Sequence, residues 1–292
     1  MTVEVNTMKL IESDVKIIEQ QSGLDGVYKQ IELAGRTCYK SEDKITEDSA
    51  KGFVKRMIES GHNAMLEHGT VYLRVPYNDV NYHFYLNKYE KNPYSRCTYG
   101  LTLNGAPVGD ICITTNYRVL VEHGWLDDLK YQCEPTKYHA KRITARFICD
   151  RGVSHEFVRH RVFSFAQEST RYCNYSKDKF GNELTFIKPS WLDTVSNKDT
   201  YSHFLRSLEW AETNYMTLLH NGLHQQQARA LLPNATKTEL VMTGFLSDWK
   251  DFFILRSPKF FGANGVHPDA AKLADQLYDI FVDKDFINGD GN

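Results

Sequence analysis

The chain has 292 residues, enough for one large domain or two small ones. Hydrophobic residues make up 41% and aromatic residues 13%, so a substantial core can be buried and intrinsic disorder is excluded. The net charge of −2 excludes general attraction to nucleic acid or to a membrane surface. No apolar run reaches the roughly 18 residues that a membrane span needs. Residues 1–20 lack the apolar segment of a signal peptide, so a cytoplasmic location is expected.

Hydrophobic periodicity predicts the elements of the first 76 residues. Alternation over 8–20 predicts an edge or half-buried strand. Helical spacing predicts helices over 27–39 and 47–60, and Gly61 is placed to end the second one. The run 69–76 (GTVYLRVP) predicts another strand.

Residues from about 77 to 135 differ in composition from the segments on either side. They are rich in Asn, Tyr and Gly and hold short β-like runs such as 110–115. We expect an insertion with a small hairpin and one helix, within a single domain that spans residues 1–292.

The last part of the chain is predicted to be mainly helical. Helical spacing returns over 138–158, and a long amphipathic helix is predicted over 202–220. Trp210 lies about 100° off its apolar stripe and is expected to pack against another element or subunit. Further helices are predicted over 225–232, 247–256 and 268–281. The expected fold is mixed α/β (α+β), with a central sheet flanked by long helices.

The densest group of chemically active side chains lies in 154–172 (SHEFVRHRVFSFAQESTRY). Arg159, Arg161 and Arg171 fall within it, on a chain that is otherwise near neutral. Guanidinium groups bind phosphate through paired hydrogen bonds, so a phosphorylated ligand is the natural partner. A solvated basic loop is the simpler alternative. Nucleic acid is disfavoured because the rest of the chain supplies no basic face.

Three other kinds of site are not supported by this segment. His155 and His160 are five residues apart, which places them about 140° apart on a helix and excludes the zinc-protease pattern, so no metal is expected. The chain has no Walker A sequence and no GxGxxG. Ser169 has no local His–Asp pair that could activate it as a nucleophile.

The segment resembles the signature of the flavin-dependent thymidylate synthases. RHR at 159–161 is followed by seven residues and Ser169, and then by Arg171 and Tyr172. The stretches 61–70 (GHNAMLEHGT) and 228–233 (ARALLP) resemble two further family segments in the same order. The resemblance covers most of the chain outside 77–135.

The resemblance implies that the chain methylates dUMP to dTMP, using methylenetetrahydrofolate, FAD and NADPH. It also implies a homotetramer with flavin sites at the subunit interfaces. The implied flavin-binding residues are His68, Thr70, Arg159, His160, Arg161, Gln167, Asp251 and His267. The implied dUMP-binding residues are Glu156, Arg159, Gln167, Ser169, Arg171, Arg229 and Arg256.

The chain departs from the family pattern at four positions. Some members carry glutamine in place of Glu156 and glutamate in place of Gln167, and flavin-contacting asparagines in place of Phe245 and Asp251. Two alternative functions therefore stay open. One is a flavoprotein that modifies uracil in nucleic acid, and the other is a nucleotide-binding protein that has lost its chemistry.

The mechanism must make the 5-carbon of uracil nucleophilic. Conventional thymidylate synthases use a cysteine that follows a proline, and none of the six cysteines here follows one. The resemblance implies that Arg256 stabilises negative charge on the uracil ring instead, while the flavin supplies hydride.

Overall fold

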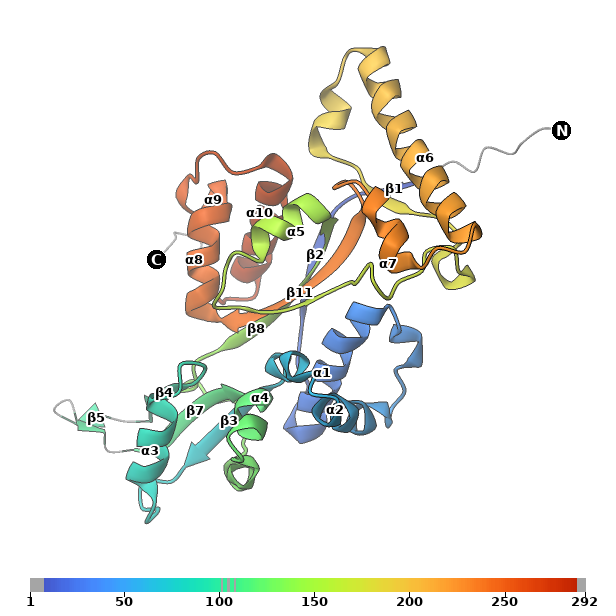
Figure 1. Ribbon diagram of the computed structural model, residues 1–292. Coiled ribbons are helices and arrows are strands. Elements are labelled where there is room, and N and C mark those ends of the chain that lie inside the picture. Colours follow the sequence, from blue (N-terminus) through green and yellow to red (C-terminus); the bar gives the residue numbers. More distant parts are fainter. Residues whose placement is uncertain (1–7, 101, 104–105, 108, 288–292) are drawn as a thin grey trace.

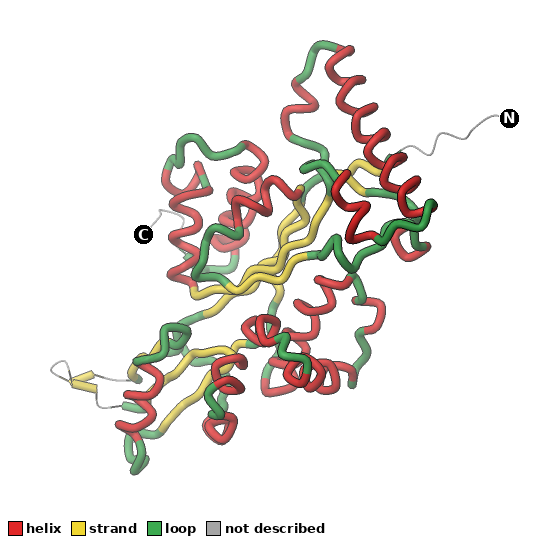
Figure 2. The backbone as a smooth tube through the Cα atoms, in the orientation of Figure 1, coloured by secondary structure: helices red, strands yellow, loops and turns green. Residues whose placement is uncertain are grey.

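A computed structural model describes residues 8–100, 102–103, 106–107 and 109–287 (Figures 1 and 2). The main sheet has the strand order β2-β8-β11-β9. These strands are Asp14–Ile18, Arg142–Asp150, Lys237–Phe245 and Ser164–Gln167. Every neighbouring pair is antiparallel. The expected mixed α/β fold is confirmed.

The two central strands differ from the sequence-based expectation. β8 pairs with β11 along its whole length, from Arg142↔Phe245 to Asp150↔Lys237. A helix was predicted over 138–158, and that prediction is wrong for its first part. No residue of β8 is exposed, so the strand lacks a regular alternation with solvent-facing polar side chains and resembles a buried helix. Helix α5 (Arg151–Phe157) begins only after Asp150, whose side chain accepts a hydrogen bond from the Val153 amide at 2.8 Å.

Alternate residues of the central strands pack toward opposite faces of the sheet. Phe147 and Met242 belong to the core under helices α8 (Leu246–Arg256) and α10 (Pro268–Asp283). Val241 packs instead with Ala34 of helix α1 (Gly23–Tyr39). Figure 1 shows α5, α8 and α10 on one side of the sheet and α1 on the other. The polar side chains of the sheet therefore also lie in two groups, one on each face.

The segment 77–135, which is expected to be an insertion, pairs with the predicted strand before it to form a second antiparallel sheet with the order β3-β7-β4. Its strands are Thr70–Val75, Ile111–Asn116 and Arg96–Tyr99. A short hairpin, β5 (Thr102–Leu103) and β6 (Ala106–Pro107), extends from it. One helix was expected here, and the described residues of the segment include two α-helices, α3 (Tyr82–Glu90) and α4 (Tyr117–Glu122). Insertion residues such as Tyr89 and Ile113 share one apolar cluster with Ile31 of α1 and Phe53 of α2 (Ser49–Glu59).

The long helix α6 (Lys198–His220) packs at the other end of the molecule (Figure 1). Leu208 and Tyr215 of this helix belong to an apolar cluster that includes Phe186 of strand β10 (Thr185–Ile187). Strand β1 (Lys9–Ile11) pairs with β10 in parallel. The remaining helices are α7 (Gln225–Ala228) and α9 (Pro258–Phe261). None of the helices in the described part of the chain is both long enough and apolar enough to span a membrane.

Candidate active site

Arg256 is the last residue of α8, and it contacts two residues of the arginine-rich segment. Its Nη1 lies 2.5 Å from Oε2 of Glu156, and its Nη2 donates to the Glu156 backbone oxygen at 3.1 Å. Its Nε donates to Nε2 of His160 at 3.2 Å. Arg256 therefore meets two members of the expected site that lie about a hundred residues earlier in the sequence.

The imidazole of His160 is held in its neutral form. It accepts a hydrogen bond from Arg256 and lies 5.0 Å from the Phe252 ring, centroid to centroid. Burial and the nearby Arg256 cation lower the pKa of His160 to about 4. The Arg256 side chain is 16% exposed, so the cation is partly desolvated but still accessible. A fixed, partly desolvated guanidinium is suited to stabilising negative charge on a bound ring.

Gln167 ends β9 on the same side of the sheet as α5. Its Nε2 donates to Ser154 Oγ at 2.9 Å and to Thr238 Oγ1 at 3.2 Å. Ser154 is one helical turn from the end of α5, two residues before Glu156. Glu156 is a residue of α5, and Gln167 is hydrogen-bonded to that helix through Ser154. These are the two positions where some relatives carry glutamine and glutamate, respectively.

The loop after β9 carries Ser169 and Arg171 and is tied to the end of α1. The Ser169 amide donates to the backbone oxygen of Cys38 at 3.0 Å. The ring of Tyr172 packs on Tyr39 with centroids 4.9 Å apart. The Arg171 guanidinium lies over the Tyr172 ring at 5.5 Å. The main chain of α1 therefore sets the position of the loop.

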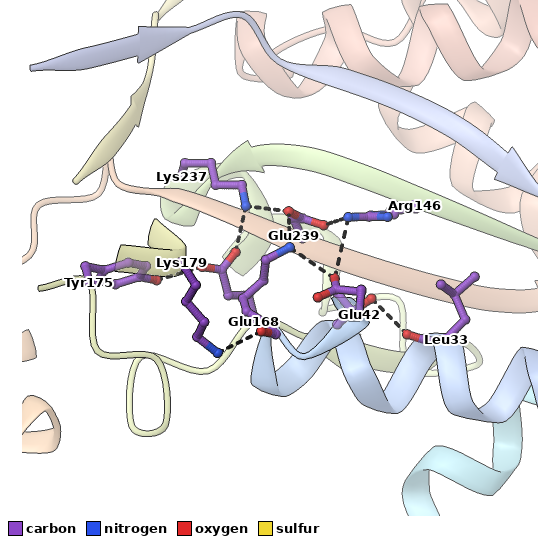
Figure 3. Close-up of polar contacts among 10 residues, drawn as sticks. Leu33, Glu42, Arg146, Glu168, Tyr175, Lys179, Lys237 and Glu239 are labelled. Atoms are coloured by element: carbon purple, nitrogen blue, oxygen red, sulfur yellow. Dashed lines mark hydrogen bonds and ion pairs between the residues drawn. The ribbon is translucent and has the colours of Figure 1, made fainter. Parts of the chain in front are cut away.

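A buried network of charges lies directly behind this loop (Figure 3). Lys237 bridges two carboxylates, at 2.9 Å from Glu168 and 2.5 Å from Glu239. Glu239 also pairs with Lys40 at 2.7 Å and with Arg146. Glu168, which lies between Gln167 and Ser169 in the sequence, also accepts a hydrogen bond from Tyr175 at 2.8 Å.

The buried carboxylates of this network depend on the cations that pair with them. Burial alone would raise the pKa of Glu239, but the cations of Lys237 and Lys40 lower it to about 2. The side chains of Glu168 and Glu239 are 2% and 5% exposed, so each carboxylate depends on its partners. None of these residues was singled out from the sequence. Charged residues within the otherwise apolar run 237–245 were the one available signal.

Four of the expected arginines are free to bind anions. Arg159, Arg161, Arg171 and Arg229 are exposed. Within the described residues, none of their guanidinium groups has an ion-pair partner. Asp251 is also exposed, on α8. Unpaired guanidinium groups, two of which flank His160 in the sequence, fit phosphate or pyrophosphate chemistry.

His68 and Thr70 lie on the α1 side of the sheet. His68 is fully buried and its Nδ1 lies 2.8 Å from Thr243 Oγ1, while its Nε2 is buried without a partner. Burial, with the nearby Arg142 cation, lowers the pKa of His68 to about 3. Thr70 Oγ1 accepts a hydrogen bond from Arg142 at 3.2 Å. No hydrogen bond or ion pair among the described residues joins His68 or Thr70 to Arg256.

His267 caps α10 and shares a cavity with Glu156. Its Nδ1 accepts a hydrogen bond from the Asp269 amide at 3.3 Å. The cavity measures about 340 Å³ and is also lined by Asp150 and Trp191. Phe245, at a position where some relatives carry asparagine, is buried, and Arg96 lies 4.7 Å from its ring.

Taken together, the mixed α/β fold and the unpaired guanidinium groups define a protein with a site suited to phosphorylated ligands. A sequence model of the family described as thymidylate synthase complementing protein matches residues 135–285. That match covers more than half of the chain, and the chain belongs to this family, which is that of the flavin-dependent thymidylate synthases.

Individual relatives agree with this membership. A protein of Pyrococcus furiosus is 32% identical over 108 residues, which cover 37% of this chain and 43% of the relative. One of Thermococcus onnurineus is 33% identical over 129 residues, 44% of this chain and 51% of the relative. One of Corynebacterium efficiens is 25% identical over 243 residues, 80% of this chain and 68% of the relative. All three are named flavin-dependent thymidylate synthase. The chain spans about half the length of the two archaeal relatives.

Among solved structures, the UMP/dUMP methylase PolB from Streptomyces cacaoi, bound with 5-Br dUMP, is similar over 94% of this chain and 93% of its own. The identity is 16% and the TM-score 0.46. At this level the similarity carries no conclusion about function.

Proposed function

We propose that this chain is a methyltransferase that converts dUMP to dTMP for de novo thymidylate synthesis. Methylenetetrahydrofolate would donate the carbon, and FAD with NADPH would provide the reduction. The observation that carries this proposal is the guanidinium of Arg256, fixed by Glu156 and His160 beside the RHR segment.

Arg256 is proposed to activate the uracil ring. A guanidinium stays charged in essentially any protein environment, so it can stabilise negative charge on the ring but cannot act as a base. This charge would enrich electron density at the 5-carbon, which must attack the donated carbon. The remaining proposed dUMP contacts are Glu156, Arg159, Gln167, Ser169, Arg171 and Arg229.

A nucleophilic cysteine is a poor alternative in this chain. Burial raises the pKa of Cys38 to about 11 and those of Cys97 and Cys173 to about 12. Burial also raises the pKa values of Cys112, Cys133 and Cys149. A thiolate nucleophile needs a lowered pKa, and none of the six thiols has one.

The residues present fit a flavin dinucleotide. The exposed, unpaired Arg159 and Arg161 could hold its pyrophosphate. We also propose a contact from His68, which is fully buried within the single chain. The flavin, when bound, supplies the reducing hydride. We further propose contacts from Thr70, His160, Gln167, Asp251 and His267. Since His68 and Thr70 are not joined to the Arg256 group within one chain, we propose a homotetramer in which several subunits complete each site. A cytoplasmic location stays a prediction.

The decisive experiment combines a visible spectrum of the purified protein with release of tritium from [5-³H]dUMP. We expect flavin absorbance and tritium release that depends on methylenetetrahydrofolate and NADPH. A colourless protein that does not bind FAD would contradict the proposal. Flavin with activity only on uracil in nucleic acid would favour a nucleic-acid-modifying enzyme. Binding of dUMP without turnover would favour a nucleotide-binding protein that has lost its chemistry.

A further inference from the structure

A cavity of about 810 Å³ lies where the insertion joins the main sheet. Its walls come from β2 and the start of α1, from β3, from the segment 132–139 and from the beginning of β8. A volume of this size is in the range of small-molecule sites. It shares no lining residue with the cavity that contains Glu156 and His267, but Thr70, proposed above as a flavin contact, lines its wall.

The acidic side chains that line this cavity have hydrogen-bond or ion-pair partners, whereas the basic ones lack ion-pair partners within the described part of the chain. Glu19 pairs with Lys284 at 2.5 Å, and Glu134 accepts a hydrogen bond from Ser22 at 2.8 Å. In contrast, the lining cations Lys137, Lys141 and Arg142 have no ion-pair partner among the described residues. The cavity is therefore left with an excess of positive charge.

Arg142 is the most deeply placed of the three cations. It donates to Thr70 Oγ1 at 3.2 Å and to the backbone oxygen of Glu67 at 3.1 Å. A guanidinium has five N–H groups, and the Nε of Arg142 is buried without any partner. Burial lowers the pKa of Arg142 to about 10, in spite of the opposing effect of Tyr72 and more distant acids. A buried cation with an unpartnered N–H and no counter-ion is costly unless an anion completes its environment.

Lys141 adds a second cation, next in the chain to Arg142. Its Nζ lies 3.8 Å from the centroid of the Phe286 ring, and both residues line the cavity. Tyr72 and Thr136 contribute a ring and a hydroxyl to the same walls. The lining thus combines cations with aromatic and hydroxyl groups, as expected for a site that binds an organic anion.

We propose that this cavity binds a small organic anion, with its phosphate or carboxylate group at Arg142 and Lys141. The assignment of this anion to a cosubstrate rests on the proposed function: NADPH carries phosphates and the folate carries carboxylates. The segment 132–139 would then give the insertion a role in cosubstrate binding. The anion site itself stands without the proposed reaction.

The test is calorimetric titration of the purified, flavin-loaded protein in the oligomeric state that it adopts in solution. Inorganic pyrophosphate, NADPH and methylenetetrahydrofolate are titrated separately into the wild type, Arg142→Met and Lys141→Gln. Lys55→Gln removes a charge from α2, where the side chain is 77% exposed and does not line the cavity, and serves as the control. Because Arg142 also holds Glu67 and Thr70, Lys141→Gln keeps the proposal testable if Arg142→Met does not fold.

We expect the affinity of at least one of these anions to fall about tenfold in Lys141→Gln and further in Arg142→Met, with Lys55→Gln unchanged. A loss for pyrophosphate and NADPH alone assigns the site to a phosphate, and a loss for the folate alone assigns it to a carboxylate. A loss for pyrophosphate in a protein without thymidylate synthase activity keeps the anion site and removes only its assignment to a cosubstrate. Unchanged affinities for all three anions in both folded variants would overturn the proposal.

Discussion

Glu156 and Arg256 form an ion pair, Oε2 to Nη1 at 2.5 Å, that joins the end of α5 to the end of α8. In this chain the proposed activating cation therefore has a counter-ion before any substrate binds. The pair is partly exposed, with 16% of the Arg256 side chain and 26% of the Glu156 side chain accessible. A bound uracil can thus compete with the carboxylate for the guanidinium.

Arg256→Ala should remove most dTMP formation. Loss of a charge that is preorganised toward the transition state typically lowers a rate by roughly 10²–10³-fold. Arg256→Lys should recover little, because an ammonium cannot reproduce the planar donors that contact Glu156 and His160. The measurement is single-turnover dTMP formation at saturating dUMP. Reduction of the flavin by NADPH without dUMP is the control and should be nearly normal. Near wild-type turnover of Arg256→Ala would show that Arg256 contributes to binding at most.

His160 should titrate far below an ordinary histidine. Its pKa of about 4 lies under the usual 6.5, so the unfolded chain takes up this proton first as the pH falls. The contribution of His160 to stability is therefore present above pH 6.5 and is lost between pH 6.5 and pH 4. NMR titration should show the pKa rising in Arg256→Met, but not to 6.5, because burial, the larger cause, remains. Urea unfolding of His160→Gln should depend less on pH over this interval. A His160 that titrates near 6.5 in the wild type would contradict the structure.

Lys237→Met should destabilise the fold. It leaves two buried carboxylates, Glu168 and Glu239, without their shared cation, and removal of one partner of a buried pair typically costs about 3–5 kcal/mol. The measurement is the free energy of unfolding in urea. Lys55→Met, on an exposed face of α2, should change it by no more than about 0.5 kcal/mol. Since the pKa of Glu239 is lowered from 4.5 to about 2, its contribution to wild-type stability should be present above pH 4.5 and be lost as the pH falls to 2. Equal stability of Lys237→Met and the wild type would mean that the network carries no net energy.

No single cysteine should be essential. Each of the six changed to serine should keep dTMP formation within about tenfold of the wild type, with modest destabilisation where the thiol is buried. Cys38 is tied to the loop that carries Ser169, but through its backbone oxygen, which Cys38→Ser leaves in place, so this variant should also stay active. A folded variant that binds FAD and dUMP but has no turnover would establish a thiol mechanism.

The protein should be a homotetramer in solution. Trp210 was expected to pack against another element or subunit, and its 71% exposure within the chain leaves a subunit as the expected partner. Light scattering should give a mass about four times that of the 33.8 kDa chain, and FAD should dissociate when the tetramer does. A stable monomer with tightly bound FAD would refute both the assembly and the shared sites.

The sequence predicts the outer helices of this fold well and its central strands poorly. α1, α2 and α10 each have one apolar face, so their three- and four-residue spacing is visible locally. β8 and β11 are covered on both faces, and their pairing joins residues roughly a hundred positions apart, such as Arg142 and Phe245. No local pattern shows such a pairing.

The same distinction holds for the candidate site. The RHR signature and Arg256 could be picked out as members of a set. Their contacts could not, because Arg256 and Glu156 are 100 residues apart in sequence. The supporting pair of Lys237 and Glu168 is similarly distant, at 69 residues, and has no sequence signature. The sequence indicates which residues belong to the candidate site, but only the fold shows which of them contact one another.

The apolar cluster shared by the insertion and helices α1 and α2 limits how this chain can be shortened. Tyr89 and Ile113 of the insertion belong to the same buried group as Ile31 and Phe53. Simple excision of residues 77–135 would place the apolar faces of both helices in water and invite aggregation. A compact relative must therefore carry polar side chains on those faces or cover them with another subunit. Grafting this insertion onto a compact relative would require the reverse changes in the two helices.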